Sequence, residues 1–247
     1  MIKHKTNPTY RSNFNDFLIN IKNYFAKNVK TIHKARNELK IINYNSTDII
    51  VKSFKVPNII NKIAYSYFRH SKAKRSYNNS LSIGDFTPAP IGYIEFYNYG
   101  FIKESFFISE QFKYDFTIRE PLLDDNFENK NTIFEAFANF TLKLHNNGIY
   151  HNDYSPGNIL IKKDNDSFIF KIVDINRMKF FNLSQKDRAR NFSKLWARDD
   201  ILMLIVNEYK KHYSCDDNFA KQALYFSRQN KRIKNLKKRL KGIEVVD

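Results

Sequence analysis

Residues 150–161 read YHNDYSPGNILI, and this segment is the strongest indication of the fold and chemistry of the chain. Asp153 and Asn158 stand five residues apart in this polar segment. Pro156 and Gly157 lie between them and favour a tight turn, which brings Asn158 back beside Asp153. Asp174 follows 21 residues after Asp153, at the end of a strand-like run. The spacing predicts that three oxygen-bearing side chains converge.

Such a set of side chains suits phosphoryl transfer. One carboxylate orients an attacking hydroxyl and accepts its proton, while hard oxygen ligands hold Mg²⁺ against the phosphates. We therefore expect Asp153 to be the catalytic base and Asn158 and Asp174 to be the metal ligands. ATP and Mg²⁺ are the expected cofactors. An isolated His-x-Asp in an Asp-rich surface loop would carry no such meaning, so the flanking sequence decides.

The flanking segments alternate between helical and strand-like patterns. A helix is predicted over 132–146, with its apolar residues on one face and Gly148 just after its end. Two short strands are predicted at 159–161 and 168–173. Further strands are predicted at 48–56, 91–99 and 106–112, and helices within 13–43, 59–81, 184–212 and 217–241. Strands dominate the first half and helices the second, which predicts an α+β chain with two lobes.

Three stretches together resemble the H-x-D-x-x-x-x-N catalytic loop and the metal-binding Asp of the protein-kinase-like fold. They are LHNNGIYHND at 144–153, NILI at 158–161 and IVD at 172–174. Within that superfamily the chain is similar to the lipopolysaccharide core kinase (Kdo/WaaP) family, which phosphorylates Kdo or heptose sugars of lipid A cores. The features that point there are DINR at 174–177, FISE at 107–110 and RARNFSKL at 188–195. The resemblance covers roughly residues 48–210.

This resemblance implies a two-lobed protein-kinase-like fold. A small β-rich N-terminal lobe would span residues 1–112, and a mostly helical C-terminal lobe with the catalytic loop and a basic tail would span 113–247. Lys52 is similar to the strand lysine that contacts the α- and β-phosphates, with Lys55 as the alternative. Backbone groups at Glu110 and Phe112 would meet the adenine ring.

The chain departs from the kinase pattern at three places. Residues 49–84 contain no acidic residue, so Lys52 lacks the usual helix Glu; either Asn78 or Asn79 takes that place, or Asp174 alone holds the lysine. No glycine precedes Gly84, so the phosphates would be covered by backbone amides within 31–45 instead of a glycine-rich loop. In the metal loop, which begins at Asp174, Asn176 stands where kinases have a glycine. It is expected to take the left-handed backbone of that glycine, which Asn tolerates better than most residues. His145 is expected to cap its helix, and His151 to bond backbone near Asp174.

Charge is distributed unevenly along the chain. The formal net charge is +17, and residues 1–75 carry 16 Lys and Arg against three acidic residues, whereas residues 228–247 carry eight against two. No zinc spacing, basic zipper or aromatic RNA-binding signature appears, which disfavours a nucleic-acid partner. The tail instead predicts a basic helix that lies on an anionic membrane surface or packs on the helical lobe. Its apolar face consists of Ile233, Leu236, Leu240 and Ile243.

Composition narrows the class of protein. With 42% hydrophobic and 16% aromatic residues, the chain is neither disordered nor fibrous. Its longest apolar run, 201–206, is far shorter than the ~20 residues of a membrane-spanning helix, and the start lacks a secretory signal. The single cysteine, Cys215, excludes an internal disulfide and fits a reducing compartment. We expect a cytoplasmic protein, peripheral at the inner face of the membrane.

Three functional hypotheses remain open. The first is an ATP-dependent kinase acting on a sugar hydroxyl of a lipopolysaccharide core, with an anionic glycolipid or sugar as acceptor. The second is a kinase for another small molecule or for protein Ser/Thr, although no A-P-E triplet follows Asp174. The third is a pseudokinase that binds nucleotide or a membrane partner without chemistry, suggested by the missing Glu and glycine loop.

Overall fold

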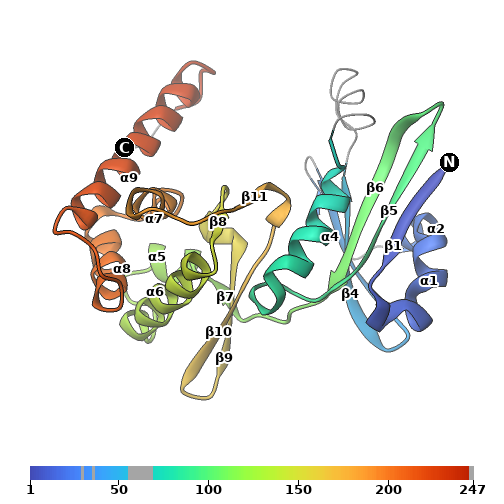
Figure 1. The fold of residues 1–247 in the computed structure, drawn as a ribbon, viewed down its shortest axis with the longest axis horizontal. Helices are drawn as coiled ribbons and strands as arrows, with labels where there is room; N and C mark the ends of the chain where they lie inside the picture. The colour runs from blue at the N-terminus through green and yellow to red at the C-terminus, as the bar shows by residue number, and fades with distance from the viewer. Residues whose placement is uncertain (29–30, 35–36, 55–68, 245–247) are drawn as a thin grey trace. The chain divides into compact units, whose positions relative to one another are not determined.

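The computed structural model describes residues 1–28, 31–34, 37–54 and 69–244, with only the backbone of 31–34. The chain forms two compact units. The first comprises residues 1–113 and 174–176, and the second comprises 114–173 and 177–247. The predicted α+β class is confirmed, since the first unit is built on a sheet and the second mainly on helices (Figure 1).

A six-stranded antiparallel sheet forms the centre of the first unit. Its strand order is β1-β5-β6-β4-β3-β2. The described part of the strand predicted at 48–56 is β4, which pairs with β3 on one side and β6 on the other, and residues 55–56 lie outside the described residues. The bounds of the strands are β1 Ile2–Thr6, β2 Thr31–Lys34, β3 Asn37–Tyr44, β4 Thr47–Phe54, β5 Pro90–Asn98 and β6 Phe101–Glu110.

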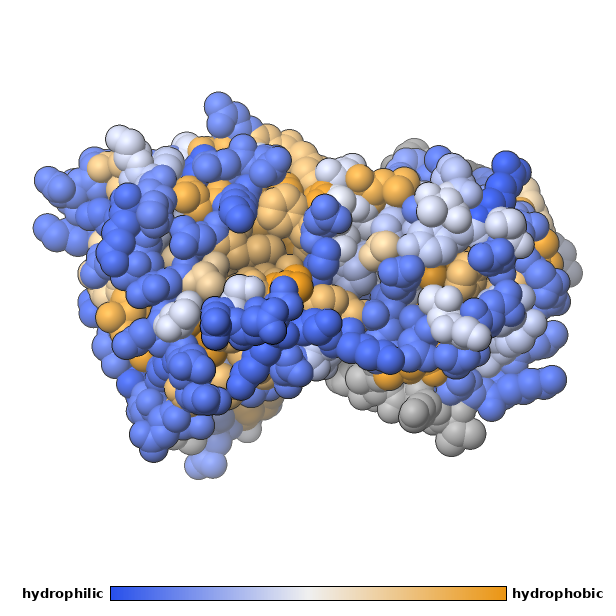
Figure 2. All heavy atoms as spheres, turned by 90° about the horizontal axis from the view of Figure 1, so that it is seen from below, coloured by the Kyte–Doolittle hydropathy of each residue, from blue (hydrophilic) through white to orange (hydrophobic). Residues whose placement is uncertain are grey.

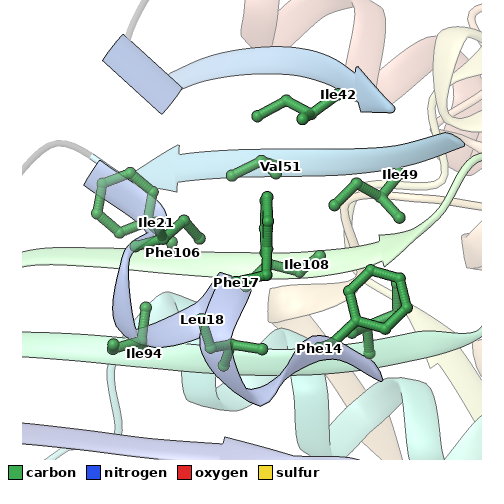
Figure 3. Close-up of a cluster of buried hydrophobic side chains, with 11 residues drawn as sticks. Phe14, Phe17, Leu18, Ile21, Ile42, Ile49, Val51, Ile94, Phe106 and Ile108 are labelled. Carbon is green, nitrogen blue, oxygen red and sulfur yellow. The ribbon is translucent and has the colours of Figure 1, made fainter. Parts of the chain in front are cut away.

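Helices cover both faces of this sheet (Figure 1). Helices α1 (Arg11–Ile19) and α2 (Ile21–Lys27) pack an apolar cluster against one face. Figure 3 shows the helix residues Phe14, Phe17, Leu18 and Ile21 directed at Ile42, Ile49, Val51, Ile94, Phe106 and Ile108. Helix α4 (Lys72–Ile83) packs on the other face through Ala73 and Tyr77, which contact Phe54 and Tyr93. Because side chains alternate along a strand, Lys52 lies on the α4 face with Phe54.

The prediction of a helix within 13–43 is right only as far as Lys27. Beyond it the chain forms strands, and all eight residues of β3 pair with β4. The apolar residues at helical spacing end at Phe25, so the helical pattern does not extend into β3. The predicted helix over 59–81 falls partly outside the described residues, and its described part is α4.

The second unit contains the predicted helix as α6 (Lys130–Asn146) and the predicted hairpin as β9 (Ile159–Asp164) and β10 (Ser167–Ile172). The helical structure predicted within 184–212 is confirmed as two helices, α7 (Gln185–Phe192) and α8 (Asp199–Lys211). The remaining elements are β7 Phe116–Thr117, α5 Arg119–Leu123, β8 Ile149–His151, β11 Met178–Phe180 and α9 Phe219–Arg239, with short 3-10 turns at Pro8–Tyr10, Gly84–Phe86, Pro156–Asn158 and Ile175–Arg177.

Hydrophilic side chains cover most of the face seen in Figure 2, with apolar side chains between them. This agrees with the charge of the chain. Among the helices of the described residues, none is long and apolar enough to cross a membrane.

Candidate active site

The loop predicted to be catalytic follows α6 in the second unit. Gly148 ends that helix in a left-handed conformation, with φ of +69°. A Cβ atom there would lie 2.8 Å from the carbonyl oxygen of Phe181, so only glycine fits this turn. The chain then forms β8, and Pro156–Asn158 makes the tight turn that the sequence predicts.

Hydrogen bonds fold the loop around Asp153. The Nδ1 atom of His151 accepts from the amide of Asp153 at 3.0 Å, and its Nε2 donates to the carbonyl of Val173 at 3.0 Å. Asn158 donates from Nδ2 to the carbonyl of Asp153 at 2.9 Å. The predicted role of His151 and the predicted proximity of Asn158 to Asp153 are therefore confirmed. With Nδ2 committed, the side-chain oxygen of Asn158 is the atom available for the predicted metal.

The half-buried carboxylate of Asp153 forms no hydrogen bond with the described residues. Its own backbone is held on both sides, because its amide and its carbonyl are each bonded. A carboxylate that is fixed at its backbone and has open oxygens can accept a hydrogen bond from an acceptor hydroxyl and then its proton.

A buried polar network supports this loop from behind. Asn191 donates from Nδ2 to the carbonyl of His151 at 2.9 Å, and its Oδ1 lies 3.1 Å from Nε2 of His145. Since an amide oxygen only accepts, Nε2 of His145 is the donor, and its Nδ1 accepts from the hydroxyl of Tyr209 at 3.0 Å. Arg188 donates to the same hydroxyl at 2.9 Å.

The expectation that His145 caps its helix is wrong. The side chain is buried, and its ring bonds two other side chains rather than the helix end. Burial lowers the pKa of His145 from 6.5 to about 3, because desolvation disfavours the imidazolium. The hydrogen bond with Asn191 opposes this effect, and the charge of Arg188 lowers the pKa by a smaller amount. His145 is therefore a neutral structural residue near neutral pH.

In the first unit, Lys52 reaches Asp174. Its Nζ lies 2.8 Å from Oδ1 of Asp174, and the two side chains are 14% and 32% exposed. Asn79 donates instead to the carbonyl of Ile175, at 2.7 Å. Of the two alternatives raised by the missing helix Glu, the structure supports Asp174 as the partner of Lys52. Lys55 lies outside the described residues.

The metal loop differs from the expectation at one position. Asp174 itself adopts the left-handed backbone, with φ of 56°, whereas Asn176 lies in the 3-10 turn and has no positive φ. The expectation that Asn176 takes the left-handed place of glycine is therefore wrong. Its side chain serves another purpose, because Nδ2 donates to Oδ1 of Asp174 at 2.7 Å.

The donor atoms around Asp174 fit a nucleotide with its metal. Oδ1 of Asn176 is buried and has no hydrogen-bond partner among the described residues, so a cation beside Asp174 would satisfy it. The ammonium of Lys52 on the same carboxylate supplies a positive charge for phosphate oxygens. Within the described part of the chain, no three His, Cys, Asp or Glu side chains gather as a metal cluster.

The end of β6 carries the residues predicted to meet adenine. The amide of Glu110 donates to the carbonyl of Ala89, and the amide of Gln111 donates to the carbonyl of Asp48, both at 2.9 Å. The side chain of Glu110 accepts from the hydroxyl of Tyr10 at 2.7 Å. The amide of Phe112 donates to no described residue. The adenine prediction remains a prediction, and it now rests on the backbone groups not used by the sheet.

The predicted site residues thus fall into two sets. Lys52, Asp174 and the end of β6 belong to the first unit, and Asp153 and Asn158 belong to the second. Within each unit the structure brings the expected pair together. Asn191 lies in the 188–195 stretch that carries the family resemblance, but the sequence assigned it no role. Tyr209 was missed, and no local pattern marks it.

Comparison with known proteins identifies the fold. The model of the "Lipopolysaccharide kinase (Kdo/WaaP) family" matches residues 115–210. A solved structure of WaaP in complex with acyl carrier protein is similar over 94% of this chain and 99% of that chain, with a TM-score of 0.61 and 14% identity. The protein-kinase-like fold and the resemblance to this family are confirmed.

Two further similarities are weaker. The Rio2 kinase of Chaetomium thermophilum, solved with ADP/Mg²⁺ and phosphoaspartate, is similar over 84% of this chain and 64% of that chain, with a TM-score of 0.48 and 13% identity. The "Probable serine/threonine-protein kinase fhkA" of Dictyostelium discoideum is 27% identical over 105 residues, which is 42% of this chain. The match spans only 17% of that relative's length.

Proposed function

We propose that this chain, whose fold is protein-kinase-like and whose residues 115–210 match the Kdo/WaaP family, is an ATP-dependent phosphotransferase that acts on a sugar hydroxyl of a lipopolysaccharide core. Kdo and heptose are the candidate sugars. The observation that carries the proposal is the loop around Asp153. It lies inside the matched region, its backbone is fixed by hydrogen bonds, and its carboxylate is open.

Each site residue has a defined role in this reaction. Magnesium-bound ATP supplies the phosphoryl group. The carboxylate of Asp153 would orient the acceptor hydroxyl and take its proton as the new O–P bond forms, while the bond from the γ-phosphorus to the bridging oxygen breaks and ADP leaves. Asn158 and Asp174 are the metal ligands, and the oxygen of Asn176 adds to the set. Lys52 binds the phosphates while Asp174 holds its ammonium in place.

The basic tail favours localisation of the protein at the inner face of the membrane. Ile233, Leu236, Leu240 and Ile243 are between 51% and 78% exposed, so the alternative that they pack on the helical unit is wrong. An exposed apolar stripe among lysines and arginines suits the interface of an anionic bilayer. A glycolipid acceptor would be found there.

A kinase for protein Ser/Thr is the second candidate, favoured by the match to the Dictyostelium kinase. Its weakness is the short chain between the metal loop and the next helix. α7 begins at Gln185, soon after Asp174, which leaves little length for a segment that grips a peptide.

The test is a transfer assay with labelled ATP, Mg²⁺ and total membrane lipid, with and without acyl carrier protein, because the similar WaaP structure contains that protein. Label is expected in the glycolipid fraction with the parent protein and not with Asp174→Asn. Label in protein alone would replace the proposal with the second candidate. A rise in melting temperature with ATP but no transfer to lipid, sugar or protein would mean a pseudokinase.

A further inference from the structure

The segment between α7 and α8 has an unusual conformation. Trp196, the only tryptophan of the chain, has a φ of 57°, which is rare for a bulky side chain. α9 holds the segment on both sides of it. Asn230 donates to the carbonyl of Ser193 at 2.9 Å, and Lys231 donates to the carbonyl of Ala197 at 2.8 Å. Strained backbone that its surroundings hold in place is common at ligand sites.

Three lysines gather at this tryptophan, all within the second unit. The ammonium of Lys234 lies 4.6 Å from the ring centroid of Trp196, and that of Lys238 lies 5.8 Å from it. Lys194 comes from the segment itself and donates to Asn230 at 3.4 Å. None of the three forms an ion pair with a described carboxylate. Like charges held together in this way repel one another, and a bound anion would relieve the repulsion.

The lysine cluster lies within electrostatic reach of the catalytic loop. Burial lowers the pKa of Lys234, and the charge of Lys194 lowers it further, while Asp153 raises it and Lys238 lowers it by smaller amounts. The pKa of Lys234 is therefore affected by the charges of Lys194 and Lys238 and by that of the expected base, Asp153.

We propose that Trp196, Lys194, Lys234 and Lys238 form the subsite that binds an anionic sugar, one that carries a carboxylate or a phosphate, next to Asp153. The ring of Trp196 holds two ammonium groups by cation–π attraction, so that one anion can meet both. An acceptor anchored there by its charge presents a hydroxyl to the loop. The inference rests on the proposed function for the identity of the acceptor, but the anion site can be tested without any transfer.

Trp196 supplies the direct test, because the tryptophan fluorescence of the full chain arises from this residue alone. The probes are free Kdo, which carries a carboxylate, glucose 1-phosphate, neutral methyl glucoside and inorganic phosphate. A saturable change is expected with either or both of the two anionic sugars and not with methyl glucoside; which of them binds shows whether carboxylate or phosphate is recognised. The double variant Lys234→Met/Lys238→Met should lose the change, while Lys237→Met, an exposed lysine of the same helix, should keep it.

Two fluorescence results would overturn the subsite. One is an unchanged response in the double variant. The other is inorganic phosphate binding as tightly as the anionic sugars, which would leave a phosphate site without sugar recognition.

Kinetics separate this inference from the proposed function. With the glycolipid acceptor, Lys234→Met should raise the acceptor KM about tenfold or more while kcat and the KM for ATP stay unchanged, and Lys234→Arg should restore it. Normal acceptor KM in the double variant would reject the subsite and leave the kinase proposal intact. Fluorescence binding without transfer to any acceptor would reject the kinase proposal and leave the anion site.

Discussion

The two units hold their functional side chains by different kinds of interaction. In the first unit, an ion pair joins Lys52 to Asp174, and both side chains keep some contact with solvent. In the second unit, His145, Asn191 and Tyr209 are all buried and uncharged, and they support the loop through hydrogen bonds. The one charge among them, Arg188, is paired with neutral acceptors.

Solvent accounts for this difference. A charged pair keeps part of its hydration where water reaches it, whereas burying a charge completely has a large desolvation cost. Buried side chains that support a loop are therefore more favourable as neutral hydrogen-bond donors and acceptors. The first unit should therefore depend on an ionised carboxylate, and the second on an unprotonated histidine. The two requirements predict different responses to mutation and to pH.

The largest effect should come from Asp153→Asn, which tests whether chemistry and stability are separate in the second unit. The carboxylate bonds no described residue, so the free energy of unfolding should change by less than about 0.5 kcal/mol. Loss of the base should lower kcat by a factor of about 10²–10⁴. Phosphoryl-transfer kinetics and thermal unfolding measure the two, and Asp166→Asn in the exposed β9–β10 turn is the matched control. Turnover near the parent value would show that Asp153 is not the base.

Protonation of His145 should give the next largest effect. The folded pKa is about 3 and the unfolded pKa is 6.5, so the unfolded state alone gains a proton as the pH falls below 6.5. Stability is therefore lost on acidification between pH 6.5 and 3, by ~1.4 kcal/mol per pH unit. The groups that face the ring are Arg188, Tyr209 and Asn191, and none is a carboxylate that would favour the charged form.

The variant His145→Gln keeps a donor and an acceptor but cannot titrate. Between pH 7 and pH 5, the parent should lose about 2 kcal/mol more of its free energy of unfolding than the variant loses. Urea unfolding at each pH measures this difference, in which the shared carboxylates cancel. Parallel pH profiles would show that His145 is already charged when folded.

A smaller effect is expected from Lys52→Met in the first unit. Removing the ammonium should destabilise this unit by about 1.5 kcal/mol and raise the KM for ATP by about tenfold or more. Hydrogen exchange should show weaker protection in β4 and unchanged protection in α6. Lys55→Met is the matched variant, because Lys55 is the other lysine that the sequence offers for this role. Equal effects of the two variants would contradict the assignment of Lys52.

Local patterns made half of this site predictable. The spacing of Asp153 and Asn158, the turn at Pro156 and Gly157, and the amphipathic α6 all depend on residues near one another in sequence, so periodicity and turn chemistry were enough to place them. The same holds for the β9–β10 hairpin. The spacing of Asp174 from Asp153, together with the family resemblance, then related Asp174 to this loop.

Features that depend on distant residues were not predictable. The strand β1 contains one apolar residue, and it is a strand because it pairs with β5 about ninety positions later. Asn191 acts on the loop from 40 residues away. The helix break at Trp196 arises where α9 binds the backbone of the segment, a contact that periodicity does not encode.

The smallest effect should come from Arg198, whose ion pairs lie in solvent. Its guanidinium bonds Asp125 at 2.8 Å and Asp200 at 2.9 Å, with all three side chains more than half exposed. Hydrogen bonds from Arg198 first and Lys130 second lower the pKa of Asp125 to about 2. This interaction favours folding above the unfolded pKa of 3.8 and is lost as the pH falls toward 2.

In the variant Arg198→Gln, the pKa of Asp125, followed by NMR titration, should rise toward its ordinary value. High salt should raise it part of the way in the parent protein. Thermal stability should barely change, because water screens exposed ion pairs and their attraction hardly exceeds the side-chain entropy lost when they form. If the pKa of Asp125 stays near 2 in the variant, Lys130 and not Arg198 holds the carboxylate. A large loss of stability would mean that exposed charges stabilise this chain as strongly as the partly buried pair of Lys52 and Asp174, and the contrast between its exposed and buried polar contacts would fail.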